Sequence, residues 1–210
     1  MIESTLQKHA LTIVGGFHPP DDEWFTGYQT ALMIGPDEPE FWSHFTQQPE
    51  YLDGLPDGMD RFSKRVLQQV AEKLGGKVYF PSDGPPYPPF IQWALKSSCY
   101  QSPVGLLVHH KAGLFTSFRG VLALSEFHDL PLPHDNPCDS CVNQPCKTAC
   151  PIEALTPSGY DVAACKTYIG SKVGSACLSG CKVRLSCPVS QNFGRVKAQS
   201  EFHMKAFVGE

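Results

Sequence analysis

The sequence predicts an α+β fold followed by a small cysteine-rich domain. Residues 1–130 alternate helical and extended hydrophobic patterns. A proline-rich stretch at residues 130–137 then breaks the composition, and eight of the nine cysteines follow it. We therefore expect an α+β domain at residues 1–130 and a second domain at residues 131–210, which depends on bound ligands for much of its stability.

The first part of the N-terminal domain has the patterns of two helices and two strands. Residues 2–9 are expected to form a short helix, and residues 11–14 an extended segment. Residues 30–35 are an apolar run closed by Gly-Pro, which is typical of a buried strand. Asp37 is then expected to cap a helix that continues through Phe45.

Segment 57–74 has the clearest helical pattern in the chain. Its apolar residues recur at three- and four-residue spacings, and Gly75 and Gly76 end it. These apolar positions are Met59, Phe62, Val66, Val70 and Leu74. Residues 77–80 are expected to form a strand and residues 90–95 a short helix.

Two further apolar stretches complete the predicted sheet. Residues 104–109 and 114–124 are expected to pair as a hairpin through a turn at residues 111–113, which brings the sheet to at least four strands. His109 and His110 are neighbours at the end of the first of these strands. Their side chains should therefore point to opposite faces, one buried and one exposed.

The cysteines fall into two groups of four that each end in Cys-Pro. The first group reads Cys138-x2-Cys141-x4-Cys146-x3-Cys150-Pro151. The second group reads Cys165, then Cys177-x3-Cys181-x5-Cys187-Pro188. So many thiols in a short stretch must be bonded to something, and the candidates are disulfides, zinc and iron–sulfur clusters.

Disulfides require an oxidising compartment, and the N-terminus does not have the pattern of a secretory signal. It begins Met1-Ile2-Glu3, with an acid in place of a basic region, and the apolar stretch at residues 11–14 is too short. A run of about 18 apolar residues, which a membrane span needs, is also lacking. We therefore expect a reducing, cytoplasmic setting, where clustered cysteines usually bind metal.

The spacing favours iron–sulfur clusters over zinc, which stays open as the alternative. Three close cysteines followed by a Cys-Pro have the order of the bacterial ferredoxin run, in which the fourth cysteine ligates the other cluster. Two spacings depart from that run: x4 replaces x2 before Cys146, and x3 and x5 replace x2 and x3 around Cys181. Two [4Fe-4S] clusters with crossed ligation are therefore predicted. The first would be held by Cys138, Cys141, Cys146 and Cys187, and the second by Cys150, Cys165, Cys177 and Cys181. Cys99 lies outside the pattern and is expected to be a buried or idle thiol.

Charge is unevenly distributed along the chain. Residues 161–210 carry seven basic and three acidic side chains, a net charge of +4 in a chain whose total is −4. An oxidised cubane with four thiolates carries about −2, so two clusters would roughly match this excess. A solvated basic surface is the alternative. The excess is small and lacks interleaved aromatic residues, so nucleic acid is not an expected partner.

Three segments precede the cysteines in an informative order. They are Val-Tyr-Phe-Pro-Ser-Asp-Gly-Pro-Pro at residues 78–86, Gly-Leu-Leu-Val-His at residues 105–109 and Gly-Leu-Phe-Thr-Ser-Phe-Arg-Gly-Val-Leu at residues 113–122. With the double-cysteine module, they resemble the epoxyqueuosine reductases, which are corrinoid tRNA-modifying enzymes, and the related reductive dehalogenases. Residues 109–124 also look like the matching strands of the cobalamin-processing (cyanocobalamin decyanase) proteins.

The resemblance implies a nitroreductase-like sandwich of the cobalamin-reductase type, with a two-cluster ferredoxin-like module that feeds electrons into it. It places Asp83 at the position of a proton-donating aspartate, a role that requires burial to raise the pKa of the carboxyl group. A plain turn at Asp83-Gly84-Pro85 is the alternative. The C-terminal extension that resembles a tRNA-binding region is lacking, so a tRNA substrate is not expected.

Three functions are consistent with these observations. The first is an electron-transfer protein whose two clusters relay single electrons from a redox partner protein or low-potential reductant to a site or partner at the N-terminal domain. The second is a corrinoid-dependent reductase of a small organic substrate, with cobalamin in an apolar groove. The third is a flavin-dependent reductase on the same fold. Electron transfer is common to all three and is the preferred prediction.

Overall fold

The computed structural model describes residues 2–19 and 22–209. The chain divides into two compact units. The first unit comprises Met1–Ser98 and Ser117–Pro133, and the second unit comprises Cys99–Thr116 and His134–Glu210. Residues 99–116, which the sequence pattern assigns to the N-terminal domain, therefore group with the cysteine-rich residues.

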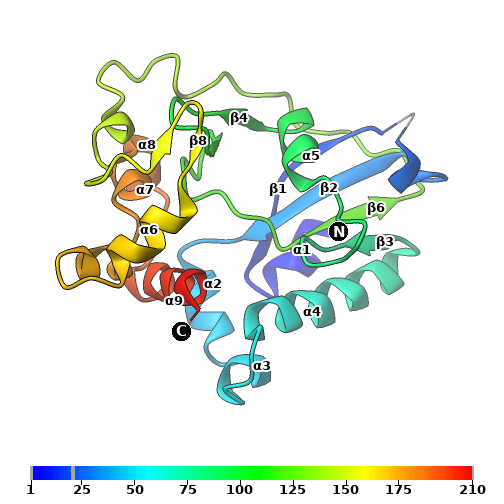
Figure 1. Cartoon of the computed structure of the whole chain (residues 1–210). Coiled ribbons are helices and arrows are strands. Elements are labelled where there is room, and N and C mark those ends of the chain that lie inside the picture. The colour runs from blue at the N-terminus through cyan, green and yellow to red at the C-terminus, as the bar shows by residue number, and fades with distance from the viewer. Residues whose placement is uncertain (1, 20–21, 210) are drawn as a thin grey trace. The chain divides into compact units, whose positions relative to one another are not determined.

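The first unit is built on a four-stranded antiparallel sheet (Figure 1). Its strands lie in the order β1 (Leu11–Phe17), β2 (Thr30–Pro36), β6 (Gly120–Leu124) and β3 (Lys77–Tyr79). β2 and β6 are the two inner strands, and every residue of both is buried. The mixed α+β class and the strands expected near residues 11–14, 30–35 and 77–80 are confirmed.

Helices cover both faces of this sheet. A side chain at Gly120 would meet Leu67 of α4 (Gly58–Leu74), so this face of β6 lies against α4. The next residue, Val121, points the other way, and its partner Tyr79 shares that second face. The Tyr79 ring lies 5.8 Å from the ring of Trp93 in α5 (Phe90–Lys96). Because both faces are covered, the inner strands are apolar throughout rather than alternating.

The remaining helices of the first unit are short. They are α1 (Ile2–Gln7), the 3-10 helix η1 (Glu23–Phe25), α2 (Glu40–Phe45) and α3 (Pro49–Leu52). The helices expected at residues 2–9, through Phe45 and at residues 90–95 are confirmed. The predicted cap at Asp37 is wrong: Pro39 occupies the cap position, and the carbonyl of Asp37 accepts from the Phe41 amide instead.

Helix α4 matches the strongest helical pattern in the sequence. It buries Met59, Phe62, Val66 and Val70 on one side, and it ends at Gly75, which has a left-handed φ of 62°. The helix starts one residue later than the expected Asp57. Asp57 itself has a φ of 56°, outside helical geometry, so the helix begins at Gly58.

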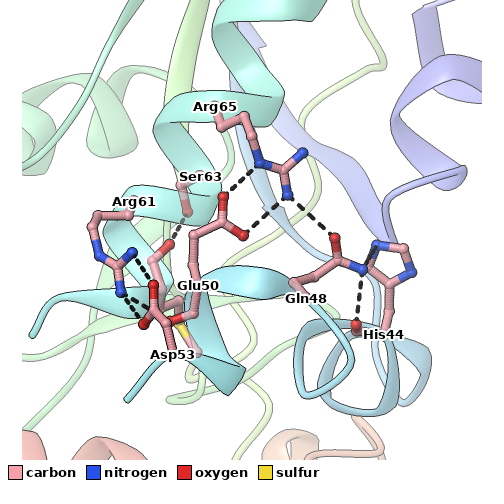
Figure 2. Close-up of polar contacts among 8 residues, drawn as sticks. His44, Gln48, Glu50, Asp53, Arg61, Ser63 and Arg65 are labelled. Carbon is pink, nitrogen blue, oxygen red and sulfur yellow. Dashed lines mark hydrogen bonds and ion pairs between the residues drawn. The ribbon is translucent and has the colours of Figure 1, made fainter. Parts of the chain in front are cut away.

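A polar network fastens α3 and the segment before it to α4 (Figure 2). Arg65 donates to both carboxylate oxygens of Glu50 and to the side-chain oxygen of Gln48. The Glu50 side chain is only 10% exposed. One turn earlier, Arg61 pairs with Asp53, and both of these side chains are about one-third exposed. The pair at Glu50 is therefore expected to contribute more to stability than the pair at Asp53, because exposed pairs contribute about 0–1 kcal/mol.

The second unit contains two small sheets and several short helices. β4 (Cys99–Gln101) pairs with β5 (Leu107–His109), and β7 (Leu155–Thr156) pairs with β8 (Gly159–Tyr160). The helical elements are η2 (Pro145–Lys147), α6 (Val162–Ile169), η3 (Gly174–Ser179), α7 (Lys182–Ser186), α8 (Pro188–Gln191) and α9 (Lys197–Val208).

The hairpin expected from residues 104–109 and 114–124 is wrong. β5 pairs with β4 in the second unit, whereas β6 lies in the sheet of the first unit. Only a single bridge, between His109 and Gly113, forms at the predicted turn. The apolar residues after the turn belong to two different cores, since Leu114 packs in the second unit and residues 120–124 in the first.

The adjacent histidines also differ from expectation. His109 is buried at the end of β5, but His110 is half-buried rather than exposed. The two rings lie 4.2 Å apart, so they do not point to opposite faces. The reason is that the strand ends at His109, and the alternation of a regular strand no longer applies to His110.

Among residues 2–19 and 22–209, none of the helices combines the length and the apolar character that a membrane crossing requires.

Candidate metal centres

The structure gathers the eight clustered cysteines around two cavities in the second unit. Cys138, Cys141, Cys146 and Cys187, the first quartet, all line a cavity of about 390 Å³. Cys150, Cys165, Cys177 and Cys181, the second quartet, all line a smaller cavity of about 30 Å³. These are the two groups of the crossed assignment. What the thiols bind stays a prediction.

The crossing is visible in the order of the cysteines along the chain. Cys150 closes the first cysteine run in the sequence but lies with the second quartet, and Cys187 closes the second run but lies with the first quartet. Each of these two residues is followed by a proline, which fixes φ and turns the chain. The interleaving joins the two halves of the cysteine-rich segment into one folded piece.

The first quartet lies in the apolar core of the second unit. Cys146 and Cys187 are buried in a cluster with Val108, Leu114 and Val183. Cys146 is carried by η2, and Cys187 lies at the junction of α7 and α8. The surrounding apolar side chains hold these two thiols away from water.

The turn at Gly113 packs closely against Cys187 of the first quartet. A β-carbon at Gly113 would lie 3.0 Å from Cys187 Sγ and 2.5 Å from the backbone nitrogen of Ser190, and φ at Gly113 is +55°. Ser190 Oγ, in turn, accepts a hydrogen bond from the Leu114 amide at 2.8 Å. Sequence reasoning took Gly113 for a hairpin turn and missed Ser190 entirely. A lone serine after Cys-Pro has no pattern that would single it out.

The thiols of the first quartet affect one another electrostatically. Burial, reinforced by the neighbouring thiols of Cys146 and Cys187, raises the pKa of Cys138 to about 11. The pKa of Cys146 is also raised, again by burial first and then by Cys187 and Cys141. Metal-binding cysteines must be deprotonated, so four thiolates in this space require a compensating positive centre. The donor set therefore fits a metal cluster.

The second quartet is assembled from four successive elements. Cys150 precedes β7, Cys165 lies in α6, Cys177 lies in η3 and Cys181 flanks the start of α7. Asp161 caps α6 by accepting from the Ala164 amide at 2.9 Å, which fixes the helix that carries Cys165. These thiols again interact: the pKa values of Cys165 and Cys177 are raised by burial and by their neighbours in the quartet.

A backbone amide donates a hydrogen bond to a sulfur of the second quartet. The Ala154 amide donates to Cys150 Sγ at 3.3 Å. Tyr160, in β8, lines the same cavity as Cys165; burial raises the pKa of the Cys165 thiol, and Tyr160 acts in the opposite direction. Sequence reasoning missed Tyr160, because the strand that carries it has only two residues.

Cys99 lies apart from both quartets, as expected. Its side chain is 3% exposed in β4, and burial raises its pKa to about 11. The nearest polar partner is the Thr116 hydroxyl, 4.0 Å from the sulfur. The expectation of a buried thiol is confirmed.

Asp83 lies in the turn that follows β3 in the first unit. Its carboxylate accepts from the Phe80 amide at 2.9 Å and lies 3.3 Å from Lys64 Nζ. The side chain is 40% exposed. These are the contacts of a turn, and the burial that a proton donor requires is not present. A catalytic role for Asp83 stays a prediction from the resemblance.

Within the part of the chain that the structure describes, no three His, Cys, Asp or Glu side chains converge on the position of a single metal ion. Comparison with protein-family models, with curated proteins and with solved structures finds no match to this chain.

Proposed function

We propose that the chain is an iron–sulfur electron-transfer protein that holds two [4Fe-4S] clusters. The first quartet would hold one cluster and the second quartet the other. The observation that carries the proposal is the grouping of the thiols: each quartet lines one cavity, and the pairing across the two sequence runs is the one that crossed ligation requires.

The chemistry of the donor set supports clusters over other uses of the thiols. All eight cysteines are free thiols in the structure. A cubane needs four sulfur donors around a shared volume, and each quartet supplies four. The net charge of +4 on residues 161–210 would offset part of the negative charge that two clusters bring.

When bound, the clusters would supply one-electron chemistry at potentials set by their surroundings. The protein's own residues hold the thiols, exclude water from them and donate to sulfur. In finer terms, the second unit would be a ferredoxin-like module, the first unit a nitroreductase-like sandwich, and a cytoplasmic redox partner or low-potential reductant the source of electrons. Cobalamin-dependent and flavin-dependent reduction of a small molecule remain alternatives that rest on the sequence.

The proposal is tested by the iron and sulfide content of three variants after anaerobic reconstitution. The wild type should bind about eight iron and eight acid-labile sulfide per chain, as two cubanes require. Cys146→Ser should remove the first cluster and Cys177→Ser the second, so each should retain about half of the iron. Cys99→Ser is the matched control, because this thiol lies outside both quartets and should leave the full content. Tight zinc binding without visible absorption would overturn the proposal.

A further inference from the structure

The turn between β4 and β5 forms part of the wall of the first cavity. Ser102, the first residue of this turn, lines the cavity together with all four cysteines of the first quartet. Two backbone hydrogen bonds fix its position: the Ser102 amide donates to the Leu106 carbonyl at 2.8 Å, and the Gly105 amide donates to the Ser102 carbonyl at 3.0 Å. Gly105 has a left-handed φ of +77°, which lets the turn close. Ser102 is therefore held in place at the cavity that the quartet lines.

The hydroxyl of Ser102 lacks a partner within the described chain. Ser102 is 5% exposed, and its Oγ is buried without a hydrogen bond to any residue that the structure describes. Buried hydroxyls in native proteins are almost always hydrogen-bonded, because leaving one unpaired is unfavourable. Ser190, which is buried in the same unit, shows the usual case: its Oγ accepts from the Leu114 amide and donates to the Ala112 carbonyl. Ser102 therefore calls for an acceptor that a bound group supplies.

The lining of the cavity indicates what that acceptor is. Apart from the cysteines, most of the lining residues are apolar, among them Pro103, Val108 and Leu114. The other polar lining residues all fall within residues 140–144. A [4Fe-4S] cluster held by the first quartet would bring sulfide and thiolate sulfurs into this cavity as acceptors, and a serine hydroxyl can donate to them.

We propose that Ser102 Oγ donates a hydrogen bond to a sulfur of the first cluster and raises the reduction potential of that cluster. The inference rests on the proposed function and assigns one further residue to it. A donor to sulfur raises the potential because reduction adds negative charge to the cluster, and the donor stabilises that charge. Ser102 does not ligate iron. It sets how readily the first cluster accepts an electron.

The test measures the midpoint potential of the first cluster alone. Cys177→Ser should remove the second cluster, so a redox titration of this variant followed by electron paramagnetic resonance reports on the first. Adding Ser102→Ala should lower the midpoint by about 59 mV, a tenfold change in the reduced-to-oxidised ratio for one electron. Adding Ser102→Thr, which keeps a hydroxyl, should leave the midpoint close to its original value. Ser140→Ala is the matched control, because Ser140 lines the same cavity but its hydroxyl donates to the Pro137 carbonyl at 3.5 Å.

Two further variants keep the test decisive. In a Cys146→Ser background only the second cluster should remain, and Ser102→Ala should leave the midpoint of that cluster unchanged. If Ser102→Ala does not hold the first cluster, Ser102→Cys takes its place. Its thiol is a weaker donor than a hydroxyl, so the midpoint of the first cluster should again fall, by less than the tenfold equivalent.

Three outcomes would overturn the inference and leave the two-cluster proposal intact. They are an unchanged midpoint of the first cluster in Ser102→Ala, an equal fall in Ser102→Thr, and loss of the first cluster from every Ser102 variant, which would indicate a packing role. A wild type that binds no reducible iron would instead overturn the proposed function.

Discussion

The backbone amide of Ala154 donates a hydrogen bond to Cys150 Sγ at 3.3 Å. The contact spans a tight turn in which Glu153 has a φ of +53° and its amide donates to the Cys150 carbonyl at 3.2 Å. This local turn directs the last cysteine of the first run toward the second quartet. The crossed arrangement of the thiols is thus built into four consecutive residues after Cys150, before any cluster is considered.

Gly113→Ala should disrupt the first quartet. The left-handed φ of +55° costs a non-glycine residue about 1–2 kcal/mol, and the added methyl group would collide with Ser190 and crowd Cys187. We expect the variant to lose about half of its iron, because the second quartet is not touched. Gly75→Ala is the matched control: its φ is +62°, but nothing lies near the added methyl group. Full iron content in Gly113→Ala would contradict the close approach of this turn to the quartet.

Ser190→Ala should destabilise the second unit. The Leu114 amide, whose hydrogen bond to Ser190 Oγ is buried, would lose its partner, at a cost of about 1–3 kcal/mol. The measurement is thermal loss of cluster absorption, which should occur at a lower temperature than in the wild type. Ser175→Ala removes an exposed hydroxyl and should change stability by no more than about 0.5 kcal/mol. If both variants lost cluster absorption at the same temperature, the hydrogen bond between Ser190 and Leu114 would contribute nothing to stability.

Glu50→Gln should destabilise the first unit by about 1–3 kcal/mol at neutral pH, because it weakens the charged hydrogen bonds to Arg65. The hydrogen bond from Arg65 holds the pKa of Glu50 below its usual range. The carboxylate therefore contributes stability above its unfolded pKa, and this contribution is lost as the pH falls through the folded pKa. All three tryptophans lie in the first unit, so urea unfolding followed by tryptophan fluorescence reports on it.

The control for Glu50 is Asp53→Asn, which weakens the exposed pair with Arg61 and should have the smaller effect. The difference between wild type and Glu50→Gln should shrink at acidic pH. A difference that stays constant from neutral to acidic pH would show that Glu50 acts through packing and not through its charge.

Asp83→Asn should leave cluster content and stability nearly unchanged. The amide oxygen of asparagine can still accept from Phe80, so the turn survives, and only the exposed contact with Lys64 is weakened. Anaerobic titration of the reconstituted protein with cob(II)alamin provides the accompanying measurement. The electron-transfer proposal expects no change in the cobalt spectrum. A spectral shift in the wild type, with turnover that Asp83→Asn abolishes, would favour the corrinoid alternative instead.

The sequence predicts the regular parts of this fold well. Helix α4 and strand β2 have uninterrupted periodic or apolar patterns and sharp glycine or proline ends, so local signals suffice for them. The spacing and the two Cys-Pro pairs predicted two quartets of cysteines, and the same two groups line the two cavities; their role as ligands stays a prediction. Both signals are contained within short segments of the chain.

The parts of the fold that were predicted wrongly depend on which of the two cores an apolar residue packs into. The hydrophobicity of a residue does not indicate which core it joins. Leu114 and Val121 are both apolar and nearly adjacent, yet they pack in different units, so the predicted hairpin failed. Ser190 matters because its partner, the Leu114 amide, is distant in the sequence. Such contacts are set by tertiary packing and have no local pattern.

The central claim is that two reducible [4Fe-4S] clusters occupy the two quartets. The most direct measurement is the spin concentration of the anaerobically reconstituted protein after full reduction with dithionite, from its electron paramagnetic resonance spectrum. Because each reduced cubane holds one added electron, the account predicts about two unpaired spins per chain and about one in Cys146→Ser or Cys177→Ser. A fully reduced protein with no such signal, and with zinc bound to the same cysteines, would contradict it.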